Sequence, residues 1–173
     1  MTREEYEAVV RAVEAQEKAV RVAHFSYEDM LALGMSVVDR AKANGETLSV
    51  AVYAPTGALV FQHLMDGTNA CNESWMRRKF RVCAETEHAT LRAWAKEVLT
   101  GETMADLGMR PETHVFSGGA FPVRLKSGEP VGVIVISGFQ HFIDHKHAVD
   151  ALAAFAGTEE YPEVPYFDVW REQ

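Results

Sequence analysis

The stretch at residues 131–137 is apolar in both registers of a two-residue repeat. Valines at positions 131, 133 and 135 alternate with Gly132, Ile134 and Ile136. Because successive side chains of a strand point to opposite faces of its sheet, such a strand needs cover on both sides. The pattern therefore predicts a central strand in a sheet that packs against other elements on both faces.

Several other short runs rich in β-branched and aromatic residues are candidates for the same sheet. The strand candidates are residues 48–54, 58–64, 114–116, 121–125 and 131–137. Pro55, Thr56 and Gly57 supply turn chemistry between the first two runs, and residues 126–129 form a hairpin loop between the last two. Hairpins join antiparallel strands, so we expect an antiparallel sheet.

Apolar residues recur at helical spacing in four longer segments. The helix candidates are residues 2–20, 26–44, 72–99 and 142–155, the third beginning at Asn72 or Ser74 and bending near residues 85–88. Helices that cover an antiparallel sheet predict an α+β fold in a single domain, residues 1–173. We assign residues 1–25 to an N-terminal helical extension, 26–156 to the core and 157–173 to a C-terminal tail.

The charge balance excludes several classes of function. Lys and Arg number 17 against 25 Asp and Glu, which gives a formal net charge of −8. Binding to nucleic acid depends on the neutralisation of phosphates, so no nucleic-acid partner is expected.

The acidic start differs from a signal peptide, and the longest apolar run is too short for a bilayer, so we expect a cytoplasmic protein without a membrane partner. Cys71 and Cys83 are expected to be reduced.

A cluster of cations lies near the start of the helix predicted at residues 72–99. It comprises Arg77, Arg78, Lys79 and Arg81, and Trp75 is one helical turn before Lys79. Cations near a helix N-terminus oppose the helix dipole. Two interpretations stay open: a solvated face paired with the acidic residues Asp66 and Glu73, or a site for an anionic ligand.

Glycines leave the main chain accessible at two places later in the sequence. Gly118 and Gly119 precede the strand predicted at 121–125, and Ser137 and Gly138 end the central strand. Glycine allows a ligand to approach the main chain, although plain turns also use it. The chain contains neither a GxGxxG nor a GxxxxGK[ST] loop, so nucleotide-binding loops of these types are excluded.

Histidines near the last helix are weak candidates for metal ligands. His141 and His145 are four residues apart, which places two imidazoles on one face of a continuous helix. Asp144, however, is a natural N-cap that would leave His141 in the preceding loop. We therefore favour solvated or capping histidines and expect no metal site. The sequence contains no GxSxG elbow, so it identifies no catalytic residue and leaves enzymatic activity open.

An ordered series of motifs resembles the haem-degrading HbpS/GlcG-like superfamily, in the branch with a long N-terminal extension. The series is Met65–Thr68, Asn72 with Trp75 and residues 77–79, residues 118–122, residues 131–138, and Asp144 with His145. The resemblance covers about residues 26–156. It implies a profilin-like fold with a five-stranded antiparallel sheet flanked by helices, a homo-oligomer, and haem as a possible cofactor. The matched positions are Asp66, Gly67, Lys79, Gly118, Gly119, Pro122, Ser137, Gly138 and Asp144.

The chain departs from the haem-binding relatives just before Lys79, where they usually carry small residues and it carries residues 75–78 in the order Trp-Met-Arg-Arg. We therefore favour a small anionic metabolite, bound between the start of the long helix and the turn at Gly118. The candidate ligand-binding residues are Asp66, Trp75, Arg77, Arg78, Lys79, Gly118, Gly119, Phe121 and Ser137. The alternatives are haem binding or degradation, and a non-catalytic assembly or adaptor role for the first helix and the aromatic tail at residues 161–170.

Overall fold

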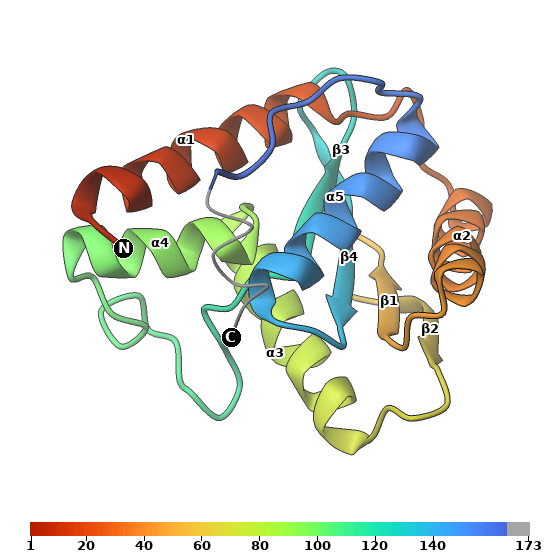
Figure 1. Ribbon diagram of the computed structural model, residues 1–173, viewed down its shortest axis with the longest axis horizontal. Coiled ribbons are helices and arrows are strands. Elements are labelled where there is room, and N and C mark those ends of the chain that lie inside the picture. Colours follow the sequence, from red (N-terminus) through yellow and green to blue (C-terminus); the bar gives the residue numbers. More distant parts are fainter. Residues whose placement is uncertain (166–173) are drawn as a thin grey trace.

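The computed structural model describes residues 1–165, which form five helices and a four-stranded antiparallel sheet (Figure 1). The helices are α1 (Arg3–Ala19), α2 (Tyr27–Asn44), α3 (Ala70–Thr86), α4 (Thr90–Thr100) and α5 (His141–Ala156). The strands are β1 (Ser49–Tyr53), β2 (Leu59–Leu64), β3 (Ala120–Arg124) and β4 (Pro130–Ser137). The α+β class is therefore confirmed.

The sheet has the order β2-β1-β4-β3, and both predicted hairpins are present. β4 pairs with β1 on one side and with β3 on the other, which confirms it as an interior strand. In the β1–β4 ladder Val50 lies opposite Ile136, and Val52 lies opposite Ile134. These four side chains belong to one face of the sheet and lie in its main core.

The prediction of a fifth strand at residues 114–116 is wrong, because the described residues form no strand there. The N–H of His114 donates to the carbonyl of Arg110 in a turn. Its own carbonyl accepts from Nε of Arg78 at 3.4 Å. The backbone of His114 is thus bonded to a turn and a side chain instead of a neighbouring strand, and a short apolar run cannot reveal that in the sequence.

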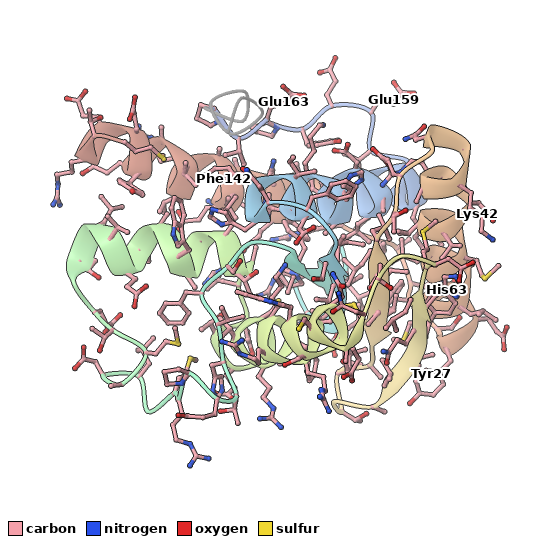
Figure 2. All side chains as sticks on the ribbon, turned by 60° about the horizontal axis from the view of Figure 1, so that its bottom comes forward. Tyr27, Lys42, His63, Phe142, Glu159 and Glu163 are labelled. Atoms are coloured by element: carbon pink, nitrogen blue, oxygen red, sulfur yellow. The ribbon has the colours of Figure 1, made fainter. Side chains whose placement is uncertain are left out.

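Helices cover both faces of the sheet, as the central-strand pattern predicted. Helices α2 and α5 pack on the face that carries Val50, Val52, Ile134 and Ile136. Helix α3 packs on the opposite face against residues of the alternate register: Ala51, Tyr53, Val133 and Val135. Figure 2 shows α5 and α3 on opposite sides of β3 and β4.

The predicted long helix is two helices, α3 and α4, separated at Glu87. Glu87 has a left-handed backbone with φ of 57°, and the carboxylate of Glu17 accepts from the N–H of Ala89 at 2.8 Å. Glu17 lies in α1, which runs beside α4 (Figure 1). The break falls at the bend expected near residues 85–88, and α1 secures it by binding the start of α4.

No helix among residues 1–165 has the length and apolar character that crossing a membrane requires. Cys71 and Cys83 are both free thiols. Three aromatic residues of the expected tail, Tyr166, Phe167 and Trp170, lie outside the described residues.

Candidate functional site

A cavity of about 500 Å³ lies between α3, the end of β4 and the start of α5. Ten residues line it: Asn72, Trp75, Lys79, Ser117, Ser137, Gly138, Phe139, Gln140, His141 and Asp144. The cavity lies where the interior strand ends. Helices α3 and α5 cover opposite faces of the sheet, and near the end of β4 the side chain of Lys79 in α3 reaches Asp144 in α5.

The floor of the cavity is an ion pair between Lys79 of α3 and Asp144 of α5. Lys79 Nζ lies 2.7 Å from Asp144 Oδ2, and each side chain is only 2% exposed. Nζ also donates to the carbonyl of Ile136 at 3.1 Å. Burial lowers the pKa of Lys79 even though the carboxylate opposes this shift, and burial raises the pKa of Asp144 even though the ammonium opposes it. Desolvation thus disfavours both charges, while their mutual hydrogen bond favours them.

Asp144 is not the N-cap of α5, which corrects the expectation from the sequence. Helix α5 begins three residues earlier, at His141, and Gln140 is its N-cap. The second carboxylate oxygen of Asp144 accepts from the N–H groups of Gly138 at 3.1 Å and Phe139 at 2.9 Å. Asp144 therefore fixes the loop between β4 and α5 as well as the ammonium of Lys79.

His141 lines the cavity as a neutral imidazole. Its Nδ1 accepts a long hydrogen bond, 3.4 Å, from the N–H of Gly118, so the ring proton lies on Nε2. Burial, together with the charge of Lys79, lowers the pKa of His141 from 6.5 to about 4.

His145 does not join His141 at the cavity. It is buried, with Nε2 at 2.9 Å from Oε1 of Gln16 in α1, and burial lowers its pKa to about 3. Neither histidine is the solvated group that the sequence favoured. Within residues 1–165 there is no cluster of three His, Cys, Asp or Glu side chains suited to a metal ion.

The basic cluster divides among three environments. Lys79 lies at the floor, Arg77 pairs with Glu73 at 3.0 Å on the outside of α3, and Arg78 lies over the ring of Trp75. The guanidinium carbon of Arg78 is 5.1 Å from the ring centroid, and Lys79 Nζ is 6.0 Å from it. No ion pair within residues 1–165 involves Arg78. The two interpretations of the cluster therefore each describe part of it. Arg77 belongs to a solvated face and Lys79 lines the cavity, whereas Arg78 does not line it and lies against Trp75, which does.

The two glycines lie close to the cavity but in different roles. A Cβ on Gly119 would lie 2.6 Å from Lys79 Nζ and 2.5 Å from the carbonyl oxygen of Ile136, so only glycine allows the strand to pass this close to the ammonium. Gly118 uses its N–H for His141 and packs against the backbone of α5. The chain thus brings Lys79 and Gly119 together, and the N–H of Gly118 is already bonded.

Two sequence candidates lie elsewhere. Phe121 is fully buried in the main core, where its ring packs edge-on against His145 with centroids 5.8 Å apart. Asp66 is exposed in the turn between β2 and α3 and does not line the cavity. The sequence patterns did not identify Gln140, Phe139 or the pairing of Asp144 with Lys79. The one signal for this pairing was that Asp144 is a charged residue on the buried stripe of α5.

The chain is similar to several known proteins. A family model described as "Haem degrading protein HbpS-like" matches residues 25–153. A UPF0303 protein of Paraburkholderia xenovorans is 31% identical over 151 residues, which is 87% of this chain and 91% of that protein. A UPF0303 protein of Schizosaccharomyces pombe is 31% identical over 147 residues, covering 84% and 82%.

Solved structures share the fold. The crystal structure of the Ybr137w protein has a TM-score of 0.78 and 23% identity, and the match covers 91% of this chain and 95% of that one. The crystal structure of HbpS has a TM-score of 0.63 and 22% identity, over 78% and 91%. The crystal structure of the PduOC:heme complex has a TM-score of 0.62 and 21% identity, over 75% and 94%.

Proposed function

The chain belongs to the family of HbpS-like haem degrading proteins, and from this premise we propose that it binds a small molecule with an anionic group in the cavity between α3 and α5. The observation that carries the proposal is Arg78, a cation that lies on the ring of Trp75 next to the cavity. It has no ion-pair partner among residues 1–165, and its Nε donates to the carbonyl of His114. In a chain with a net charge of −8, a cation in this position favours an anionic ligand.

The size and polarity of the cavity support the same proposal. About 500 Å³ falls within the range of roughly 300–1,000 Å³ typical of sites for small molecules. Asn72, Ser137 and the imidazole of His141 supply polar groups, and Trp75 supplies an apolar wall. This combination of one aromatic surface and a few convergent polar groups is typical of sites for metabolites.

Thermal shift measurements with a panel of small carboxylates and inorganic phosphate test the proposal. We expect at least one anion to raise the melting temperature of the wild-type chain. The shift should shrink in Arg78→Ala and persist in Arg77→Ala, because Arg77 already pairs with Glu73 outside the cavity. Failure of every anion to stabilise the protein, or equal shifts in the two variants, contradicts the proposal.

Haem is a second candidate, favoured by the family's description and by a neutral imidazole beside Trp75 in one cavity. A neutral histidine is the form that ligates iron. His141 would offer Nε2 only after its ring proton moved to Nδ1, which breaks the hydrogen bond from Gly118. The donor set therefore fits haem at the cost of that bond, and we rank haem below a small anion.

Addition of hemin to the wild-type chain and to His141→Ala separates the two candidates. Haem binding through His141 predicts a Soret band distinct from that of free hemin in the wild type and its loss in the variant. A spectrum like that of free hemin removes this candidate and leaves the anion proposal intact. Self-assembly stays a prediction of the sequence, and sedimentation of the full chain measures it.

A further inference from the structure

A second cavity, here called the hairpin cavity, lies at the opposite end of β4 from the cavity between α3 and α5. It has a volume of about 290 Å³ and lies between the end of α1, the β3–β4 hairpin and the break between α3 and α4. Figure 1 shows the end of α1 beside this hairpin. The lining residues are Glu14, Glu17, Lys18, Arg21, His88, Arg124 and Gly128. None of them lines the cavity between α3 and α5.

Two arginine side chains of the hairpin cavity lie beside the same glycine. Arg124 donates from Nη1 to the carbonyl of Gly128 at 2.9 Å. Nη1 of Arg21 lies 3.7 Å from the position that a Cβ on Gly128 would occupy. The two guanidiniums are therefore close together, and their like charges repel each other. An anion bound between them would relieve that repulsion.

Backbone carbonyls hold both guanidiniums in place without neutralising them. Arg21 donates from Nε to the carbonyl of Glu17 and from Nη1 to that of Lys126, each at 3.4 Å. Arg124 also donates to the carbonyl of Glu87. The carboxylate of Glu87 is 3.7 Å from Nη2 of Arg124, but the Glu87 side chain is 61% exposed, so water screens this pair. A guanidinium has five N–H groups, so both arginines keep donors beyond those that these bonds use.

The two carboxylates that line the hairpin cavity are already bound to other groups. Glu14 accepts from Nε of Arg92 at 2.7 Å. Glu17 accepts from the N–H of Ala89 at 2.8 Å, and its carboxylate lies 2.7 Å from Nδ1 of His88. Within residues 1–165, neither carboxylate forms an ion pair with a Lys or Arg side chain of the cavity. The cations of the cavity are therefore available to a ligand.

We propose that the hairpin cavity binds a phosphate group, either free or carried by a small metabolite. Its lining has three Lys or Arg side chains against two carboxylates, in a chain whose net charge is −8. Two of these cations, Lys18 and Arg21, have no carboxylate partner among residues 1–165. A phosphate monoester carries a charge of about −1.5 to −2 near pH 7 and has several oxygens that accept from guanidiniums. A monocarboxylate carries one charge and satisfies fewer of these donors.

Titrations followed by two-dimensional amide NMR test this site on the full chain. The probes are inorganic phosphate, glycerol phosphate and acetate, each added at constant ionic strength, because salt screens exposed charges. We expect phosphate to shift the amide signal of Gly128 in a saturable manner and acetate to bind about ten-fold or more weakly. Tighter binding of glycerol phosphate assigns the site to a phosphorylated metabolite, and tighter binding of inorganic phosphate assigns it to the free ion.

The variant Arg21→Gln should weaken phosphate binding about ten-fold or more, because it removes an unpaired cation with its charged donors. Arg11→Gln is the matched control, since it removes the same charge from α1 outside the cavity. Arg11 is 69% exposed and lies 4.0 Å from Glu7. This control should bind phosphate as the wild type does.

The outcomes separate this inference from the proposed function. Absence of a saturable shift at Gly128, equal binding of acetate and phosphate, or equal losses in Arg21→Gln and Arg11→Gln overturns the inference. Shifts confined to Gly138, which lines the cavity between α3 and α5, also overturn it and support the proposed function instead. The wild-type titration needs no variant, so it decides the inference even if Arg21→Gln does not fold.

Discussion

Arg77 and Lys79 are two residues apart on α3 and each pairs with a carboxylate, yet their surroundings differ completely. The pair of Arg77 with Glu73 spans one turn of α3, and its side chains are 62% and 30% exposed. The pair of Lys79 with Asp144 joins α3 to α5, and both side chains are 2% exposed. A helix that covers a sheet places neighbouring cations on opposite faces, one toward water and one toward the core.

The difference shows how burial changes the energetics of an ion pair between a cation and a carboxylate. Water screens the outer pair, so its formation and its loss both change the free energy of unfolding little. The inner pair has lost its hydration, so each charge depends on the other. The buried pair also ties two helices to the end of β4, through the carbonyl of Ile136 and the N–H groups of residues 138 and 139.

The largest expected effect comes from Lys79→Met, which breaks the buried pair and leaves a carboxylate without its counter-ion. We expect the free energy of unfolding to fall by about 3–5 kcal/mol, measured by urea denaturation near pH 7. The cause is the uncompensated charge of Asp144 and not the loss of packing, since Met fills a similar volume.

The double variant Lys79→Met/Asp144→Asn is the control for this cause. It should be clearly more stable than Lys79→Met, because it removes the second buried charge while a side-chain oxygen remains for the loop. If both variants are equally unstable, the charge is not what makes the single variant fail, and the contrast with Arg77 loses its explanation.

A pH titration extends the comparison to His141, which shares the cavity with Lys79. The folded pKa of about 4 lies below the ordinary 6.5, so the unfolded chain takes up this proton first as the pH falls. The stabilisation is complete above pH 6.5 and is lost as the pH falls toward 4, which amounts to about 3 kcal/mol.

His141→Gln should remove this part of the pH dependence, so the difference in stability between wild type and variant should change by about 3 kcal/mol from pH 7 to pH 4. His24→Gln is the matched control, because the side chain of His24 is 81% exposed. A constant difference between wild type and His141→Gln across this range would contradict the buried, neutral imidazole.

A smaller effect is expected from Gly119→Ala, which puts a methyl group against the buried pair. Gly119 has φ of 129°, and the new Cβ would lie 2.6 Å from Lys79 Nζ. We expect a loss of about 1–3 kcal/mol in the free energy of unfolding. Gly101→Ala is the comparison, since Gly101 also has positive φ, 73°, but a methyl group there would meet no heavy atom within 4 Å. Equal losses in the two variants would mean that backbone strain alone, and not contact with Lys79, causes the effect.

Local patterns predicted most of the fold. The two-sided apolar run at β4, the hairpin at Pro55 and the helical spacing at residues 26–44 each depend on neighbouring residues, and all three elements are present. The expected strand at 114–116 failed because its backbone groups bond to a turn and to Arg78, which is distant in the sequence. A one-dimensional pattern contains no information about such a partner.

The site depends on long-range contacts more than the fold does. Lys79 and Asp144 are 65 positions apart, and no periodicity links them. The sequence drew attention to the cations of α3 because they oppose the helix dipole, but it could not distinguish the buried member from the solvated ones. It also assigned Asp144 to a helix cap, because an Asp near the start of a predicted helix is a frequent N-cap residue.

The smallest expected effect belongs to Arg77→Ala, which removes the outer pair of the comparison. An exposed pair at i, i+4 contributes a few tenths of a kcal/mol, so the free energy of unfolding should change by less than about 0.5 kcal/mol. Added salt should shrink even this change, because ions screen exposed charges, and should alter the effect of Lys79→Met far less. Urea denaturation of both variants at low and high salt measures the two effects. A loss in Arg77→Ala of several kcal/mol, insensitive to salt, would show that Arg77 is bound within the fold, and the division of this helix into a solvated face and a buried cation would be wrong.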